Sequence, residues 1–142
     1  MKKIQFTLLV FIFSTLISFN VNSKNNYFSS GENFFIKKNY DKSKFQFEKD
    51  IVFNPKNEKS YLYLAKIYKM EKNDKFQEQN LNTVILLDPK NEEALYLLAL
   101  LKIKQSNFER SKELIQIFKK VCNKICVKEE ELSKKLKDLQ TK

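Results

Sequence analysis

The tetrapeptide Pro-Lys-Asn-Glu occurs twice in this sequence, at Pro55–Glu58 and again at Pro89–Glu92. The same step along the chain relates Leu64-Ala65 to Leu98-Ala99. A fixed period of about 34 residues indicates an array of similar units, because one unit of that length cannot bury its apolar face alone. The period therefore predicts a repeat protein.

Each unit is predicted to be a pair of helices. Apolar residues recur at helical spacing, as in Tyr61, Leu64 and Tyr68, and both prolines fall between such stretches. Asn57 and Asn91 stand where a side chain would cap the helix that follows. The predicted helices cover residues 26–38, 41–53, 58–71, 75–87, 92–105 and 108–121.

The chain resembles three consecutive tetratricopeptide repeats, at residues 24–57, 58–91 and 92–125. Repeats of this family carry large, small and aromatic residues and a closing proline at set positions. The matching residues are Tyr27, Ser30-Gly31, Phe34, Tyr40-Asp41, Ser43, Phe47 and Pro55; Tyr61, Leu64-Ala65, Tyr68, Leu81, Val84 and Pro89; and Leu95, Leu98-Ala99, Phe108-Glu109, Ser111, Ile115 and Phe118. The departures from the pattern are Asp50, Asp74, Gln77 and Lys102. The resemblance implies an all-α fold, a right-handed α-solenoid of three helix-turn-helix repeats.

A seventh helix is predicted over residues 127–139. Its apolar residues would share one side, with Glu–Lys pairs at four-residue spacing on the other. One apolar face and one charged face suit a capping helix that ends a solenoid. Residues 140–142 are predicted to fray, so the repeat domain with its cap would span residues 24–139. The apolar residues of this helix are Val127, Leu132, Leu136 and Leu139.

Residues 1–23 have the pattern of a signal peptide. Lys2 and Lys3 precede a largely apolar stretch over residues 4–21, and Val21-Asn22-Ser23 is a suitable cleavage site. The protein is therefore predicted to be exported to the periplasm. The alternative is an uncleaved anchor in the inner membrane, which would leave the rest of the chain facing the periplasm.

The composition argues against catalysis, cofactors and nucleic acid. The chain has no histidine and a single glycine, which removes the usual general base, the commonest metal ligand and glycine-rich phosphate loops. The formal net charge is +10, yet Arg110 is the only arginine, and arginine is the residue that best pairs with phosphates and base edges. The sequence thus predicts a protein that is not an enzyme, has no cofactor or metal, and binds no nucleic acid.

Cys122 and Cys126 lie between the last repeat and the predicted capping helix. In an exported protein such a pair is predicted to form a disulfide. The helix would then have to break near Asn123-Lys124, because an unbroken helix would strain the bond. The alternative interpretation is a reactive thiol pair that handles copper or disulfides.

The resemblance also implies a binding surface, because the first helix of each tetratricopeptide repeat lines a concave face that holds a partner segment. A basic centre between apolar shoulders would suit an extended peptide with acidic and apolar side chains, or a free C-terminal carboxylate. The chaperone-binding branch of the family has Lys and Asn where this chain has Phe28 and Glu32, so that activity is not expected. The predicted groove residues are Phe28, Glu32 and Phe35; Lys59, Leu62, Lys66 and Lys69; and Tyr96, Leu100 and Ile103.

The sequence therefore predicts a non-catalytic adapter or scaffold that binds a segment of another bacterial envelope protein. Membrane contact is expected only if the N-terminal segment is retained. Self-association stays open, because residues 94–101 are eight consecutive apolar residues, more than one buried face requires. The surplus side chains, Tyr96 and Leu100, would meet a partner, a second copy or the end of the solenoid.

Overall fold

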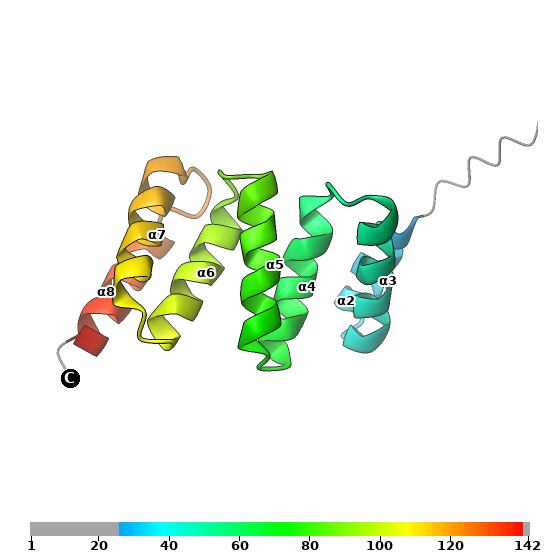
Figure 1. Ribbon diagram of the computed structural model, residues 1–142, viewed down its shortest axis with the longest axis horizontal. Coiled ribbons are helices and arrows are strands. Elements are labelled where there is room, and N and C mark those ends of the chain that lie inside the picture. The colour runs from blue at the N-terminus through cyan, green and yellow to red at the C-terminus, as the bar shows by residue number, and fades with distance from the viewer. Residues whose placement is uncertain (1–25, 141–142) are drawn as a thin grey trace, which may run out of the picture.

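The computed structural model describes residues 26–140, and within them the chain forms seven α-helices joined by short turns. Each helix packs against the next along the chain, and α8 also contacts α6 (Figure 1). The predicted helices agree with the observed ones to within two residues at every end, which confirms the all-α repeat solenoid. The helices are α2 (Tyr27–Ile36), α3 (Tyr40–Phe53), α4 (Glu58–Met70), α5 (Asp74–Leu87), α6 (Glu92–Lys104), α7 (Phe108–Val121) and α8 (Lys128–Gln140).

The predicted fraying does not include Gln140, which belongs to α8. The predicted signal peptide lies outside the described residues, as do Thr141 and Lys142. In the described part, no helix is both long and apolar enough to cross a membrane.

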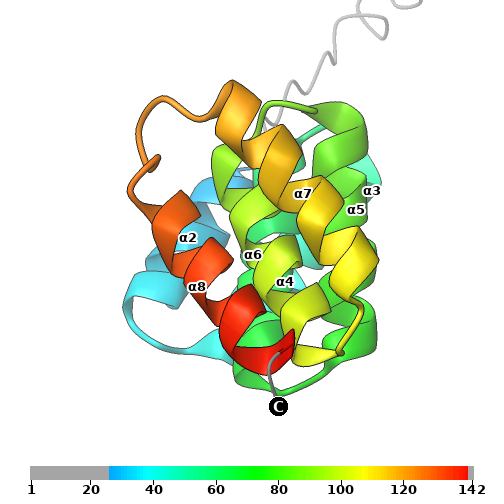
Figure 2. The ribbon, with the colours of Figure 1, turned by 90° about the vertical axis from the view of Figure 1, so that its left-hand side faces the viewer.

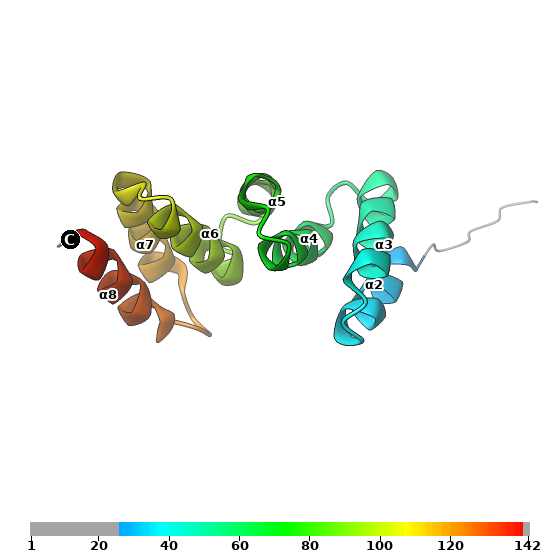
Figure 3. The ribbon, with the colours of Figure 1, turned by 90° about the horizontal axis from the view of Figure 1, so that it is seen from below.

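The helices stand in two rows that follow a curve. Figure 3 shows α2, α4, α6 and α8 along one side and α3, α5 and α7 along the other, with α2 and α8 projecting beyond α4 and α6. The first helix of each repeat and the capping helix therefore line the inner, concave face. Figure 2, seen from the C-terminal end, shows α8 lying beside both α6 and α7.

The three turns inside the repeats are copies of one another. Lys38, Lys72 and Ser106 each have a φ of 57°, a left-handed conformation that is uncommon for residues other than glycine. The next residue in each case, Asn39, Asn73 or Asn107, donates its backbone N–H to a carbonyl five residues earlier, which is the Schellman ending of a helix. The side chain of the same asparagine then caps the second helix of the repeat. These caps recur with the period of the sequence.

The two predicted caps between repeats have different outcomes. Asn91 accepts a hydrogen bond from the Ala94 N–H at 3.0 Å, as expected. Asn57 stands at the same position before α4, but its side chain forms no cap bond. Its amide instead donates to the Asp50 carboxylate at 2.7 Å. Asn57 is therefore the N-cap residue, as predicted, but its side chain does not cap the helix, because a neighbouring buried carboxylate competes for it.

Asp50 replaces a small residue of the family pattern and forms a polar cluster between the first two repeats. It is 1% exposed and accepts hydrogen bonds from Asn54, Asn57 and the Ser60 hydroxyl. These donors satisfy a carboxylate that would otherwise be costly to bury. The cluster fixes the turn between α3 and α4.

The apolar interior divides into two clusters. The first cluster is small and centres on Phe47, Leu64 and Ile67, where the first repeat meets α4. The main cluster surrounds α6, whose Leu95 and Leu98 are fully buried, and extends to α5, α7 and α8. The first repeat therefore depends on a separate and smaller core.

Gly31 allows α2 and α3 to approach closely. The Ser43 hydroxyl donates to the Gly31 carbonyl at 2.9 Å, and a Cβ at this glycine would lie 2.7 Å from a ring carbon of Phe47. That distance is far inside van der Waals contact. The glycine is therefore required here by packing, since its backbone is ordinary helix.

We predict that Gly31→Ala destabilises the protein. Overpacking a close contact costs about 1–3 kcal/mol, which exceeds the gain of up to about 1 kcal/mol from replacing glycine by alanine in a helix. The midpoint of denaturant unfolding should fall, whereas the exposed control Ser29→Ala should change it little. A Gly31→Ala protein as stable as the wild type would show that Phe47 can move aside without loss.

Lys102, another departure from the family pattern, is a buried cation with a partner. It is 9% exposed, and its ammonium group forms an ion pair with Glu78 of α5 and donates to Gln105 at 3.0 Å. An aromatic residue is thus replaced by an ion pair that joins α5 to α6. The acidic partner belongs to the preceding repeat, so the pattern of a single repeat does not reveal it.

We predict that Glu78→Ala lowers the free energy of unfolding by about 1–3 kcal/mol, because it leaves a poorly hydrated ammonium group without its counter-charge. Lys102→Met should be nearly neutral, and the double variant should recover most of the loss. A thermodynamic cycle of the three variants measures this coupling. Equal losses in Glu78→Ala and in the double variant would contradict it.

Candidate functional site

The N-terminal part of the concave face is an aromatic cluster shared by α2 and α4. The rings of Phe28 and Phe35 lie 6.0 Å and 5.0 Å from the ring of Tyr63, measured between centroids. The Tyr63 hydroxyl donates to the Glu32 carboxylate at 3.1 Å. The three predicted groove residues of α2 therefore lie together, and each of them contacts Tyr63 of the same protein in place of a bound partner.

Tyr63 is a residue of this face that the sequence interpretation missed. It stacks on the Phe47 ring at 4.8 Å, and the Lys66 ammonium group lies 5.0 Å from its ring centroid. Burial raises the pKa of Tyr63, and the hydrogen bond to Glu32 raises it further. Helical spacing could have found it, because Tyr63 is four residues after Lys59 and three before Lys66.

The centre of the face is less basic than predicted. Lys66 forms an ion pair with Glu93 of α6 at 2.9 Å, so part of its charge is neutralised. Lys59 and Lys69 form no ion pair with any described residue. Leu62 is partly buried and packs against the main cluster. The positive charge along α4 therefore comes mainly from Lys59 and Lys69.

The C-terminal part of the face is covered by α8. The Tyr96 hydroxyl donates to the Glu131 carboxylate at 3.1 Å, and the Lys128 ammonium group lies 5.5 Å from the Tyr96 ring centroid. The hydrogen bond from Lys128 holds the pKa of Glu131 below its ordinary value, and the bond from Tyr96 acts in the same direction. Tyr96 therefore contacts the capping helix at the end of the solenoid, which is one of the three partners expected for it.

The repeat register predicts that Ile103 faces a partner, and this prediction is wrong. Ile103 is 3% exposed and belongs to the main cluster together with Leu132 and Leu136 of α8. The family pattern could not show this, because the capping helix lies outside the repeats. Leu100 is only partly buried and lines a pocket.

This pocket, which we call the basic pocket, lies where α4, α5, α6 and α8 meet and has a volume of about 350 Å³. Three lysines from three helices surround a leucine floor. The Lys104 ammonium group lies 2.7 Å from both carboxylate oxygens of Asp74, so the other two lysines supply the unbalanced charge. The lining residues are Lys69, Asp74, Gln77, Leu97, Leu100, Leu101, Lys104 and Lys135.

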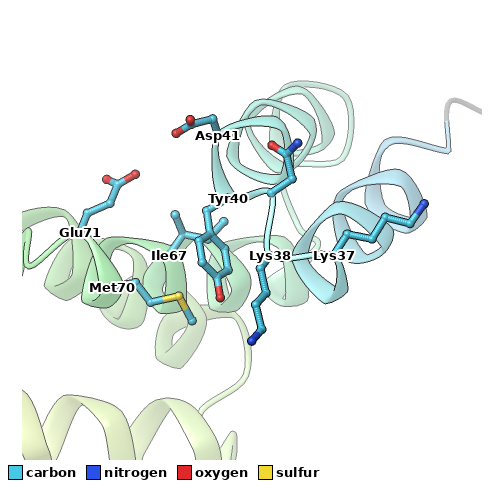
Figure 4. A pocket seen from close by; sticks show the side chains of 8 residues that line it. Lys37, Lys38, Tyr40, Asp41, Ile67, Met70 and Glu71 are labelled. Carbon is cyan, nitrogen blue, oxygen red and sulfur yellow. The ribbon is translucent and has the colours of Figure 1, made fainter.

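A second pocket occupies the equivalent position one repeat earlier, with a volume of about 610 Å³. Figure 4 shows the Tyr40 ring beside Ile67 and Met70, between the α2–α3 turn and the last turn of α4. Tyr40 and Met70 precede Asp74 and Lys104 by one repeat period. The Asp74–Lys104 ion pair is therefore replaced here by Tyr40 and Met70. Two lysines and two carboxylates also line this pocket, which we call the first-repeat pocket.

The corner between α7 and α8 ties the cap to the start of α6. The helix breaks where predicted, and the Sγ atoms of Cys122 and Cys126 meet across the break, with their Cα atoms 5.2 Å apart. The Glu92 carboxylate accepts the backbone N–H groups of Ile125 and Lys124 at 3.0 Å. These bonds hold the pKa of Glu92 below its ordinary value. The cap is therefore fixed at its first turn as well as along its apolar side.

The described residues contain no group of three or more His, Cys, Asp or Glu side chains placed to hold a metal ion. What the concave face offers is lysine ammonium groups, tyrosine hydroxyls and leucine side chains within reach of solvent. Such groups bind by charge, hydrogen bonding and apolar contact.

Solved structures with this architecture are numerous, although no family model and no curated protein matches the sequence. The first domain of Spaghetti (RPAP3) bound to an HSP90 peptide is 18% identical, with a TM-score of 0.73 over 87% of this chain and 99% of that one. The TPR2B domain of yeast Sti1 in a complex with pHsp70 is 14% identical, with a TM-score of 0.72 over 80% of this chain and 94% of that one. The Yersinia enterocolitica secretion chaperone SycD, with a peptide of the translocator YopD, is 12% identical, with a TM-score of 0.72 over 87% and 97%. The chain therefore has the tetratricopeptide-repeat fold that its period predicted.

Proposed function

We propose that the protein is a non-catalytic adapter that binds a peptide segment of another protein on its concave face. The observation that carries this proposal is the basic pocket, a hollow of this face with lysines above a leucine floor. Similar structures in which the bound partner is a peptide support the same mode of binding. Such a pocket favours a segment that combines acidic and apolar side chains.

The segment is expected to differ from the peptide tails bound by the chaperone-binding relatives. Phe28 and Glu32 stand where that branch of the family has cationic and amide side chains. Here Phe28 is packed against Phe47 and Tyr63, and Glu32 holds the Tyr63 hydroxyl. An acidic peptide would meet a carboxylate at this end of the face, so its acidic side chains should bind nearer to α6 and α8.

We propose that this binding takes place in the bacterial envelope, with the repeat domain in the periplasm. The support comes from the sequence, in the apolar stretch after Lys2 and Lys3 and in a cysteine pair suited to an oxidising compartment. The position of the cysteines supports a structural disulfide rather than a reactive thiol pair, because the two sulfur atoms meet across the break before α8.

We predict that the native protein, purified without reductant, has no titratable thiol. Reduction should lower the free energy of unfolding by about 2 kcal/mol, as expected for opening so short a loop. The double variant Cys122→Ser with Cys126→Ser should be as stable as the reduced protein and insensitive to reductant. Two reactive thiols in the native protein would instead favour the thiol-dependent function.

The adapter function is tested by capture from the envelope of the native organism, followed by mass spectrometry. The wild-type bait is compared with Lys66→Glu/Lys69→Glu, which reverses charge on the concave face. The matched control is Lys75→Glu/Lys120→Glu, which makes the same charge change at exposed positions of the outer row. We predict that the control retains the partner recovered by the wild type and that the concave-face variant loses it. Recovery of the same partner by all three baits would contradict binding at this face.

A further inference from the structure

We infer that the basic pocket recognises an acidic side chain that adjoins an aliphatic residue in the bound segment. This inference rests on the proposed peptide-binding function and specifies its ligand. The pocket must therefore supply three things: a net positive charge, a floor for an aliphatic side chain, and a hydrogen-bond donor for the carboxylate.

The charge of the pocket is positive because its carboxylate is already paired. Lys104 holds both oxygens of Asp74, while Lys69 has no counter-charge among the described residues. Lys135 lies 3.5 Å from Glu131, but that carboxylate also holds Lys128 at 3.0 Å and the Tyr96 hydroxyl. Lys135 is thus only weakly engaged. An incoming carboxylate would lie between Lys69 and Lys135, where it is attracted by both.

The floor of the pocket is built from three leucines of α6. Leu97 and Leu101 are almost fully buried, and Leu100 is partly buried and lines the wall. Leucine side chains have no polar atom to pair with a charge, so they favour an aliphatic group beside the carboxylate. A glutamate next to a leucine in an extended segment supplies both groups.

Gln77 supplies the donor. It is 4% exposed and lines the pocket, and its side-chain amide forms no hydrogen bond with any described residue. No fully buried side-chain nitrogen or oxygen of the described part lacks a partner, so the Gln77 amide keeps some contact with solvent, and the pocket that Gln77 lines is where an acceptor could reach it. A nearly buried amide of this kind gains from an acceptor that enters the pocket. A carboxylate oxygen is such an acceptor.

The first-repeat pocket differs from the basic pocket in its charge, because its lining has two lysines, Lys37 and Lys38, and two carboxylates, Asp41 and Glu71. At equivalent positions it has Met70 in place of Lys104 and Tyr40 in place of Asp74 (Figure 4). Consecutive residues at the end of α4, Lys69 and Met70, line the basic pocket and the first-repeat pocket respectively. A segment that crosses the end of α4 would pass from a pocket with equal numbers of lysines and carboxylates to one in which lysines are in excess.

The test uses the full-length protein and fluorescein-labelled eight-residue peptides of glycine and serine, blocked at both ends. The central pair is Leu-Glu, Leu-Gln, Ala-Glu or Leu-Lys, so that glutamate is the only carboxylate of the peptide chain and the label is the same in all four peptides. Fluorescence anisotropy should show Leu-Glu binding about tenfold more tightly than Leu-Gln, a difference of about 1.4 kcal/mol. Ala-Glu should be weaker than Leu-Glu, and moderate salt should reduce the preference for glutamate.

Variants locate the site. Lys69→Gln and Lys135→Gln should each weaken Leu-Glu binding by about threefold to fivefold, the range for exposed charge pairs, and leave Leu-Gln unchanged. Lys75→Gln and Lys134→Gln remove the same charge from exposed positions outside the pocket, and they should have no effect. Gln77→Leu should also weaken Leu-Glu binding.

Equal affinity for Leu-Glu and Leu-Gln, no binding of either peptide, or equal effects of pocket and control lysines would each overturn the inference. These outcomes differ from a failure of the proposed function. The adapter proposal fails if the concave-face bait keeps its partner, whatever the peptides do. A partner lost by that bait, together with peptides that show no preference, would mean that the concave face binds but the basic pocket does not select the acid.

Discussion

A helix pair in this array has more apolar surface than its two helices can cover for each other, so every pair is stable only when the next element packs on it. α6 shows this constraint most clearly. It is apolar on nearly all sides, and α5, α7 and α8 together cover it. The capping helix is therefore part of the last repeat in energetic terms, because without α8 the side chains around Leu132 and Leu136 would face water.

The same constraint explains how much of the fold could be predicted. The repeat period, the apolar spacing and the positions of proline determine which segments are helical, so the predicted helix boundaries lie close to the observed ones. The absence of a side-chain cap by Asn57 could not be predicted, because it depends on Asp50, which belongs to the preceding helix and is buried only in the folded protein. The Glu78–Lys102 ion pair could not be predicted for the same reason.

The binding face was harder to predict than the fold. Repeat register indicates which residues of a first helix share a face, and the structure brings Phe28, Glu32 and Phe35 together around Tyr63. It does not indicate what covers them. Ile103 is buried in the main cluster together with residues of the capping helix. Tyr63 was missed, although its spacing from Lys66 places it on the same side of α4. Side chains that serve as both core and surface are the ones that pattern alone cannot assign.

The division of the interior into two clusters has a consequence for how the molecule opens. The first repeat is held by the small cluster around Phe47, while α4 to α8 share the main cluster. In a linear array the units need not open together, and a weakly attached end opens more often than the middle. Amide hydrogens of α2 and α3 should therefore exchange with solvent sooner than those of α6. A segment bound across α2 and α4 would slow that exchange, whereas a segment confined to the basic pocket would leave it unchanged.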